Sequence, residues 1–293
     1  MLNILSILFS STVRSATPLI FPALGGTFSE KSGVFNIGLD GMMTVGAFTA
    51  VLLSYKTGSP WLGLIGAMIV GGLFGLLLAF LSIHFKANQV VVGTAINILA
   101  ASLTTFLLVE IWGKPGQTDN VNYFMPWGPF NMFTYFAFIL VGISYFVIYK
   151  TPFGLRIRAV GEHPRSADTL GVNVYIIRYI CVTLSGVLAG IGGASLSIGS
   201  ISLFKEGMVA GKGFIALAAM IFGKWHPIGA ALACLFFGLA DAIQTLSMSF
   251  GLKVPKEFLF ALPYIMTMLA VSGIIGKAVG PAAGGIPYDK GEK

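Results

Sequence analysis

The sequence is poor in charge. Only 10% of its 293 residues are Asp, Glu, Lys or Arg, whereas 56% are hydrophobic, and the mean hydropathy is +0.87. A water-soluble globule of this length could not coat its surface with so few polar side chains. The sequence therefore predicts an integral membrane protein.

Cysteine and histidine are also scarce. The two cysteines, Cys181 and Cys234, lie within apolar runs, which indicates small packing residues and argues against a disulfide framework or a metal site. The three histidines, His84, His163 and His226, are isolated in separate segments, and there is no HExxH motif, nucleophile elbow or paired intramembrane carboxylate. We therefore expect no enzyme activity and no bound metal.

Nucleotide and nucleic-acid motifs are missing as well. Residues 207–213, GMVAGKG, lack the GxxxxGK[ST] spacing of a phosphate-binding loop. The net charge of +7 is not gathered into a basic stripe interleaved with aromatic residues, as a nucleic-acid surface would require. We expect no cofactor in this chain and no nucleic-acid partner.

Long apolar runs fill the sequence instead. A helix needs about 20 residues to cross a hydrocarbon core of about 30 Å, whereas barrel strands would show short alternating segments. The sequence thus predicts an all-α, polytopic transmembrane bundle of about 8 to 10 helices. The expected spans cover residues 3–27, 35–55, 61–83, 90–112, 131–149, 175–198, 227–249 and 258–276.

A shorter apolar run at residues 213–223 cannot cross untilted. It is either a re-entrant half-helix or a span completed by the residues around it, and the sequence leaves this choice open. A turn from Gly223 to Pro227 should follow, with Pro227 opening the next helix. We expect these segments to form one broken element, as in many transporters.

The densest group of basic residues flanks or lies within the loop after the fifth span, and comprises Lys150, Arg156, Arg158, Arg165 and Arg178. The positive-inside rule places this loop in the cytoplasm. Counting crossings back from it places residues 113–130 and the N-terminus outside. The arginines could be topology markers alone.

Helix start and stop signals divide residues 151–174 of this loop into two short helices. Thr151 and Pro152 open the first, Gly161 and the His163-Pro164 step end it, Pro164 opens the second, and Gly171 ends that one. Arg156 and Arg158 would present a charged face to water or to a partner. Because a topology marker needs no capped helices, the pattern favours a rigid docking element.

Three polar residues lie near the start of the second span. They are Ser32, Asn36 and Asp40, and glycines lie among them. A carboxylate near mid-bilayer costs at least about 2.5 kcal/mol, so Asp40 should face a cavity or a polar partner. Asn97 and Asp241 lie within apolar runs and pose the same choice, with helix–helix contact favoured for these two.

The chain is expected to form one membrane domain over residues 1–279. Residues 280–293, GPAAGGIPYDKGEK, offer little to bury and predict a flexible C-terminal tail.

Three segments together resemble a known family. They are SGVFNIGLDGMMTVGAF, TPFGLRIRAVGEHPRSADTLGV and GKGFIALAAMIFGKWHPIGAALACLFFGLADAIQ. They are similar to permease subunits of bacterial ABC importers in the branched-chain amino acid, ribose and nucleoside group. The nucleoside branch (basic membrane protein type), and its shorter permease, is the most similar. The resemblance extends from about Thr17 to Gly273.

The resemblance implies a multi-pass subunit of the bacterial cell membrane that forms half of a nucleoside path. Its partners would be a longer, unlike permease, an extracellular substrate-binding lipoprotein, and a cytoplasmic ATPase that uses the ATP. The residues implied in coupling to the ATPase are Arg156, Arg158, Gly161, Glu162, Pro164 and Ala167. The expected path residues are Ser32, Asn36, Asp40 and Asn97.

Other functions remain open at this point. Within the importer class, ribose, galactose or branched-chain amino acids could replace the nucleoside, because pore residues do not reveal a ligand. An ion-driven secondary transporter would use Asp40 or Asp241 as a titrating group. A structural membrane subunit without a solute path is the third class.

Overall fold

The computed structural model describes residues 2–249 and 279–290. Within these ranges the chain is helical, and β-pairing is confined to two isolated bridges, Gln117–Lys205 and Trp127–Phe130. The helices of the first half are α1 (Leu2–Lys31), α2 (Leu39–Thr57), α3 (Pro60–Ala79), the π-helical turn η1 (Phe80–His84), α4 (Gln89–Trp112) and α5 (Met132–Lys150). Those of the second half are α6 (Pro152–Glu162), α7 (Pro164–Thr169), α8 (Val174–Leu196), the π-helical turn η2 (Ser197–Ile201), α9 (Lys212–Phe222) and α10 (Pro227–Ser249).

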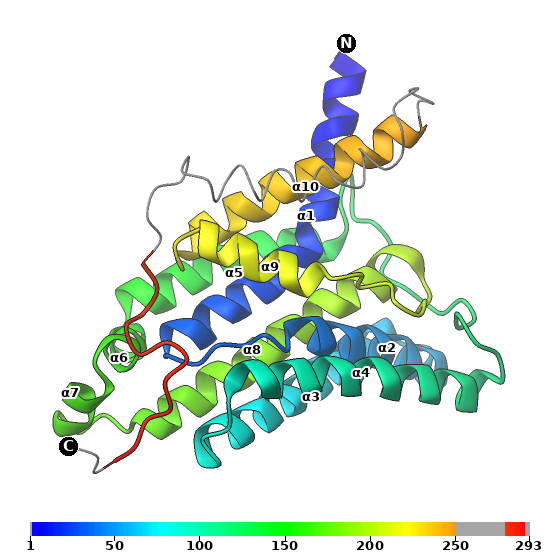
Figure 1. Ribbon diagram of the computed structural model, residues 1–293. Coiled ribbons are helices and arrows are strands. Elements are labelled where there is room, and N and C mark those ends of the chain that lie inside the picture. The colour runs from blue at the N-terminus through cyan, green and yellow to red at the C-terminus, as the bar shows by residue number, and fades with distance from the viewer. Residues whose placement is uncertain (1, 250–278, 291–293) are drawn as a thin grey trace.

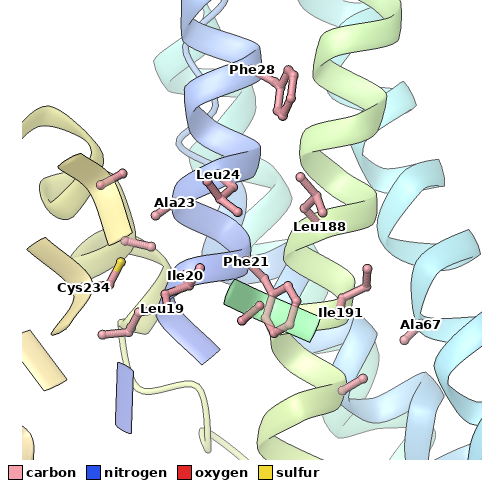
Figure 2. Close-up of a cluster of buried hydrophobic side chains, with 14 of the residues drawn as sticks. Leu19, Ile20, Phe21, Ala23, Leu24, Phe28, Ala67, Leu188, Ile191 and Cys234 are labelled. Carbon is pink, nitrogen blue, oxygen red and sulfur yellow. The ribbon is translucent and has the colours of Figure 1, made fainter. Parts of the chain in front are cut away.

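Helix α8 lies at the centre of the bundle and packs along α1, α2 and α3, while α1 also packs along α10 (Figure 1). Apolar side chains from α1 and α8 fill the space between them. Phe21 and Leu24 of α1 face Leu188 and Ile191 of α8 (Figure 2), and all four are buried. Burial of such side chains, at about 2 kcal/mol each relative to water, fixes α8 as the axis on which the other helices are arranged.

Helices α3 and α8 approach so closely that only glycine fits at their crossing. A Cβ atom on Gly186 would overlap the carbonyl oxygen of Gly71 and lie 2.9 Å from the Cα of Gly75. A Cβ on Gly71 would lie 2.5 Å from the carbonyl oxygen of Gly186, and one on Gly190 would overlap that of Ala67. We call these four glycines, Gly71, Gly75, Gly186 and Gly190, the glycine seam. Small residues of this kind let membrane helices pack backbone to backbone.

Six of the described helices are long and apolar enough to cross a membrane. They are Leu5–Lys31, Pro60–His84, Gln89–Trp112, Met132–Lys150, Val174–Ile201 and Pro227–Ser247. Helix α2 is not among them, since Asp40, Lys56 and several Gly and Thr residues dilute its apolar content. The chain is thus a multi-pass membrane protein that is helical within the described ranges, as predicted. The predicted span at residues 258–276 lies outside the described residues.

The broken element expected near residue 213 is confirmed. After η2, residues 202–211 continue without regular helix, and α9 then adds only 11 residues. The main-chain NH of Glu206 donates to the carbonyl of Gly116 in the loop between α4 and α5, whereas Trp225, just after α9, contacts Glu30 near the end of α1. The segment therefore runs from one end of the bundle to the other in an irregular half and a helical half.

The two ends of the bundle differ. One end, here called the α6 end, carries α6, α7, the end of α1 and the turn between α9 and α10 (Figure 1). The opposite end carries residues 113–131, which hydrogen-bond to residues 198–206. A flexible tail was predicted from residue 280, whereas the structure packs residues 279–290 against the α6 end, with Ala283 and Tyr288 buried.

Candidate functional site

Helix α6 is fixed to the end of α5 by local chemistry. The Thr151 hydroxyl accepts a hydrogen bond from the main-chain NH of Gly154 at 3.2 Å, and Pro152 occupies the first turn. A Cβ on Gly154 would overlap the carbonyl oxygens of Val147 and Ile148, so α6 folds directly back onto α5. The two short helices predicted in this loop are therefore present. No flexible linker separates α6 from α5, because α6 begins directly after Lys150 and Thr151.

One face of α6 is turned into the protein. Ile157, Val160 and Gly161 are buried there. A Cβ on Gly161 would overlap the carbonyl oxygen of Lys31 at the end of α1, and Ala167 of α7 is buried as well. Gly161 and Ala167, both among the expected coupling residues, are thus packed against this chain.

The other face of residues 151–174, here called the α6–α7 loop, is exposed and carries both charged and apolar groups. Arg156 and Glu162, two of the predicted coupling residues, lie on it, and Pro164 is half-buried at the step between the helices. Leu155 is 61% exposed and Leu170 is 84% exposed. Such a surface suits a protein partner, because apolar groups ringed by charges mark interaction sites.

The two arginines of α6 have separate environments. Arg156 is exposed, whereas Arg158 is half-buried, with its guanidinium carbon 5.2 Å from the centroid of the Tyr149 ring. Lys31 Nζ lies 5.5 Å from the same centroid. Two cations thus share one aromatic ring, and the buried Nε of Arg158 has no hydrogen-bond partner among the described residues. The predicted pair of outward arginines is therefore split, with one facing water and one facing the bundle.

The turn between α9 and α10 meets this cluster. Lys224 and Trp225 both have positive φ angles, 54° and 52°, which makes the turn tight. Trp225 Nε1 donates to the carboxylate of Glu30 at 2.7 Å. The His226 ring lies 4.9 Å from the Tyr149 ring, and burial, helped by nearby Lys31, lowers the pKa of His226. The broken element is thereby joined to α1 and α5 next to α6.

Sequence reasoning missed the contact between Trp225 and Glu30. The available signal was a carboxylate close to the end of an apolar helix, which needs a donor when it is buried. Its donor lies 195 residues away, so local spacing did not reveal it. His226 itself lies in the turn between α9 and α10.

Two of the expected path residues are fully buried between helices. The Ser32 hydroxyl donates to the carbonyl of Ser29 at 2.6 Å. The Asn36 amide donates to the Ser185 hydroxyl of α8 at 2.8 Å, and its carbonyl accepts from the main-chain NH of Gly38. These contacts hold the segment between α1 and α2 against α8.

The other two, Asp40 and Asn97, are half-buried. An Asp40 carboxylate oxygen accepts from the main-chain NH of Gly213 at 3.0 Å, at the first turn of α9, where the helix dipole favours an anion. Asn97 of α4 accepts from the NH of Gly41 at 2.7 Å and donates to the carbonyl of Ile37. Together they tie α4 and α9 to the start of α2.

Asp241 lines a cavity of about 30 Å³ with Ser15 and Lys212, which has room for about one water molecule. A larger cavity of about 170 Å³ lies toward the opposite end, lined by polar residues that include Arg14, Thr17, Asn131, Thr134 and Ser200 and by the apolar residues Pro18, Pro126 and Phe133. In the part of the chain that the structure describes, no group of three or more His, Cys, Asp or Glu side chains could hold a metal ion.

Comparison with known proteins decides the family. The model of the branched-chain amino acid transport system / permease component family matches residues 8–271. The chain belongs to this permease family. The permease is 45% identical to the guanosine ABC transporter permease protein NupQ of Bacillus subtilis (strain 168), with 99% of each chain covered. It is 38% identical to the nucleoside ABC transporter permease protein NupC of Lactococcus lactis, with 98% of each covered. It is 26% identical to a second B. subtilis protein, the guanosine ABC transporter permease protein NupP, over 91% of this permease and 83% of that one.

Proposed function

We propose that this permease is a subunit of an ABC importer for nucleosides in the bacterial cytoplasmic membrane. NupQ is a guanosine permease and NupC a nucleoside permease, and their full-length identities of 45% and 38% to this chain support a nucleoside solute. The α6 end carries Lys31, Lys86, Lys150, Arg156, Arg158, Arg165, Lys224 and Lys290, and the positive-inside rule makes it cytoplasmic.

Coupling to ATP hydrolysis is assigned to the α6–α7 loop. The observation that carries this assignment is the two-sided character of α6. One face is locked onto α1 and α5 through Gly161 and Gly154, and the other exposes Leu155, Arg156 and Glu162. A separate ATPase subunit would press on the exposed face, and because α6 cannot bend away from the bundle, the push would move the whole α6 end.

The solute path forms between this permease and a second, unlike permease. B. subtilis has two guanosine permease proteins, NupQ and NupP, that both match this chain. Helix α4 supports a shared path because it packs mainly on α2 and α3 and leaves the polar residues Thr94 and Ser102 exposed. Asp40 of α2 and Asn97 of α4 border this path, whereas Ser32 and Asn36 hold the helices beside it. A lipoprotein receptor outside the cell delivers the nucleoside.

The coupling assignment is tested by charge reversal. A complex of this permease with its second permease, ATPase and receptor is reconstituted in liposomes, and ATP-driven uptake of radiolabelled guanosine is measured. The double variant Arg156→Glu/Arg158→Glu should lose at least about tenfold of uptake while ATP hydrolysis continues. Lys56→Glu/Lys205→Glu, an equal charge change at two exposed residues of the opposite end, is the matched control. Unchanged uptake in the double variant would contradict the assignment.

An ion-driven secondary transporter is the competing function, with Asp40 or Asp241 as the titrating group. The capping of α9 by Asp40 gives that carboxylate a structural task instead. Uptake of guanosine by energised vesicles that contain this chain without ATP or an ATPase would favour the competitor.

A further inference from the structure

Residues 279–290, here called the C-terminal strap, lie along the α6 end and run beside α6 (Figure 1, red). The main-chain NH of Ala283 donates to the carbonyl of Gly161 at 2.9 Å, and that of Gly285 donates to the carbonyl of Gly33 at 3.2 Å. Gly161 lies in the last turn of α6, and Gly33 lies in the turn between α1 and α2. The strap therefore bonds the α6–α7 loop to the segment that leads to Asn36 and Asp40.

Arg178 of α8 fastens the same junction from inside. Its side chain is buried, with 1% exposure. Its Nε donates to the carbonyl of Ser32 and its Nη1 to the carbonyl of Ile286, both at 3.1 Å. A buried guanidinium is costly to desolvate, and no carboxylate lies within ion-pair distance of it among the described residues. Its donors instead join α8 to the α1–α2 turn and to the strap.

The last residues of the strap, 288–290, contact α7, the start of α8 and the loop between η1 and α4. Lys290 Nζ lies 3.3 Å from the Asp168 carboxylate of α7, and Asp289 pairs with Lys86 in the loop between η1 and α4. The buried Tyr288 ring lies 5.5 Å from the Tyr175 ring at the start of α8. Helix α7 has only six residues and is too short to be stable by its own turns, so it depends on contacts such as these.

We propose that Arg178 and the C-terminal strap are positioning elements of the coupling apparatus. They join the α6–α7 loop, the α1–α2 turn and the start of α8 into one body, so that a displacement of α6 reaches the turn before Asp40 without being absorbed by the loop. This inference rests on the proposed coupling function. It assigns a transmitting role to residues that touch neither solute nor nucleotide.

The first test removes the fastening and measures uptake per ATP hydrolysed in the reconstituted complex. Deletion of residues 279–293 and, separately, Arg178→Met should each lower this ratio at least about fivefold. Arg178→Met removes the buried charge along with its hydrogen bonds, so assembly with the other subunits should survive. Arg178→Lys, which keeps the charge and can reach one carbonyl, should lie between Arg178→Met and the parent. Arg14→Met is the matched control, because Arg14 also donates to a main-chain carbonyl, that of Pro129, but at the opposite end.

The outcomes separate the two proposals. If the parent complex shows no ATP-dependent uptake, the proposed function fails. If the parent transports and both the deletion and Arg178→Met keep its uptake per ATP, only the strap inference fails. Loss of assembly without any change of that ratio in the assembled fraction would reduce the strap to a folding element and would also overturn the inference.

The second test asks whether α6 and the strap move together. The main-chain NH of Ala282 lies 3.4 Å from the Glu162 carboxylate, so cysteines at these two positions can be joined by a short, reducible bifunctional methanethiosulfonate. The native cysteines are buried, and the single variants Glu162→Cys and Ala282→Cys serve as controls. Cross-linked protein should transport as well as the untreated double variant. Loss of uptake on cross-linking, with recovery on reduction, would show that the two parts separate during the cycle and would overturn the inference.

Discussion

Where α3 crosses α8, glycines bring two backbones together, and a Cβ on Gly186 would lie 2.9 Å from the Cα of Gly75. At the α6 end the contacts run through long polar side chains, among them Arg178, Arg158 and Trp225. Backbone packing of the first kind has a single arrangement, because no side chain can shift to absorb a movement. Long side chains other than Arg178, which the strap holds in place, can exchange partners. We therefore expect the glycine seam to stay rigid through the transport cycle and the α6 end to move as one body relative to it.

The largest effect is expected at the seam. Gly186→Val would force α3 and α8 apart against the carbonyl oxygen of Gly71, and overpacking of this kind costs about 3 kcal/mol or more. We expect little monodisperse protein in detergent and a strongly lowered thermal midpoint. Gly142→Val in α5 is the matched control, because nothing lies within 4 Å of a Cβ at that position. Equal stability of the two variants would contradict the claim that the glycine seam admits only one packing arrangement.

The ends of the short helices could be predicted because they depend on adjacent residues. Thr151 and Pro152 begin α6, Pro164 begins α7, and the turn from Gly223 to Pro227 separates α9 from α10. Each signal is a cap or a fixed φ angle, which acts within a few residues. The bundle class followed just as directly from the long apolar runs.

The partners of these elements could not be predicted, because they come from distant parts of the chain. Hydropathy gives the strap little to bury, yet its main-chain NH groups bond to Gly161 and Gly33. The helical spacing of Ile157, Val160 and Gly161 marks the inward face of α6, but the Tyr149 ring that receives Arg158 belongs to α5, so this contact did not follow from the sequence of α6. The abundance of glycine indicated close packing but did not tell which pairs meet, such as Gly71 with Gly186.

A smaller effect should follow from removing one polar contact at the α6 end. Trp225→Phe keeps an aromatic ring but leaves the buried Glu30 carboxylate without the indole donor. A buried acceptor that loses its partner costs about 1–3 kcal/mol, so the thermal midpoint should fall by less than in Gly186→Val. Trp127→Phe, at a position that is 78% exposed, should change little. A Trp225→Phe variant as stable as its control would show that the polar contacts of this end contribute nothing to holding it.

The smallest effect should be a pH dependence from His226. Its ring lies against Tyr145 and Tyr149 of α5, with Lys31 of α1 nearby and Arg158 of α6 over the same Tyr149 ring. Burial, then the charge of Lys31, lowers the pKa of His226 from 6.5. The native protein thus binds fewer protons than the unfolded chain, so stability is full above the ordinary pKa of histidine and falls as the pH drops through it. Because the ring is only half-buried, the loss should be modest.

The measurement compares thermal midpoints of the parent and His226→Gln between about pH 7.5 and about pH 5.5, where the variant should show a smaller pH dependence. The control His163→Gln, at an exposed histidine of the same end, should match the parent. Parallel profiles for all three proteins would mean that the cations of the α6 end do not oppose a further charge there. In that case the contrast with the uncharged seam would rest on packing alone.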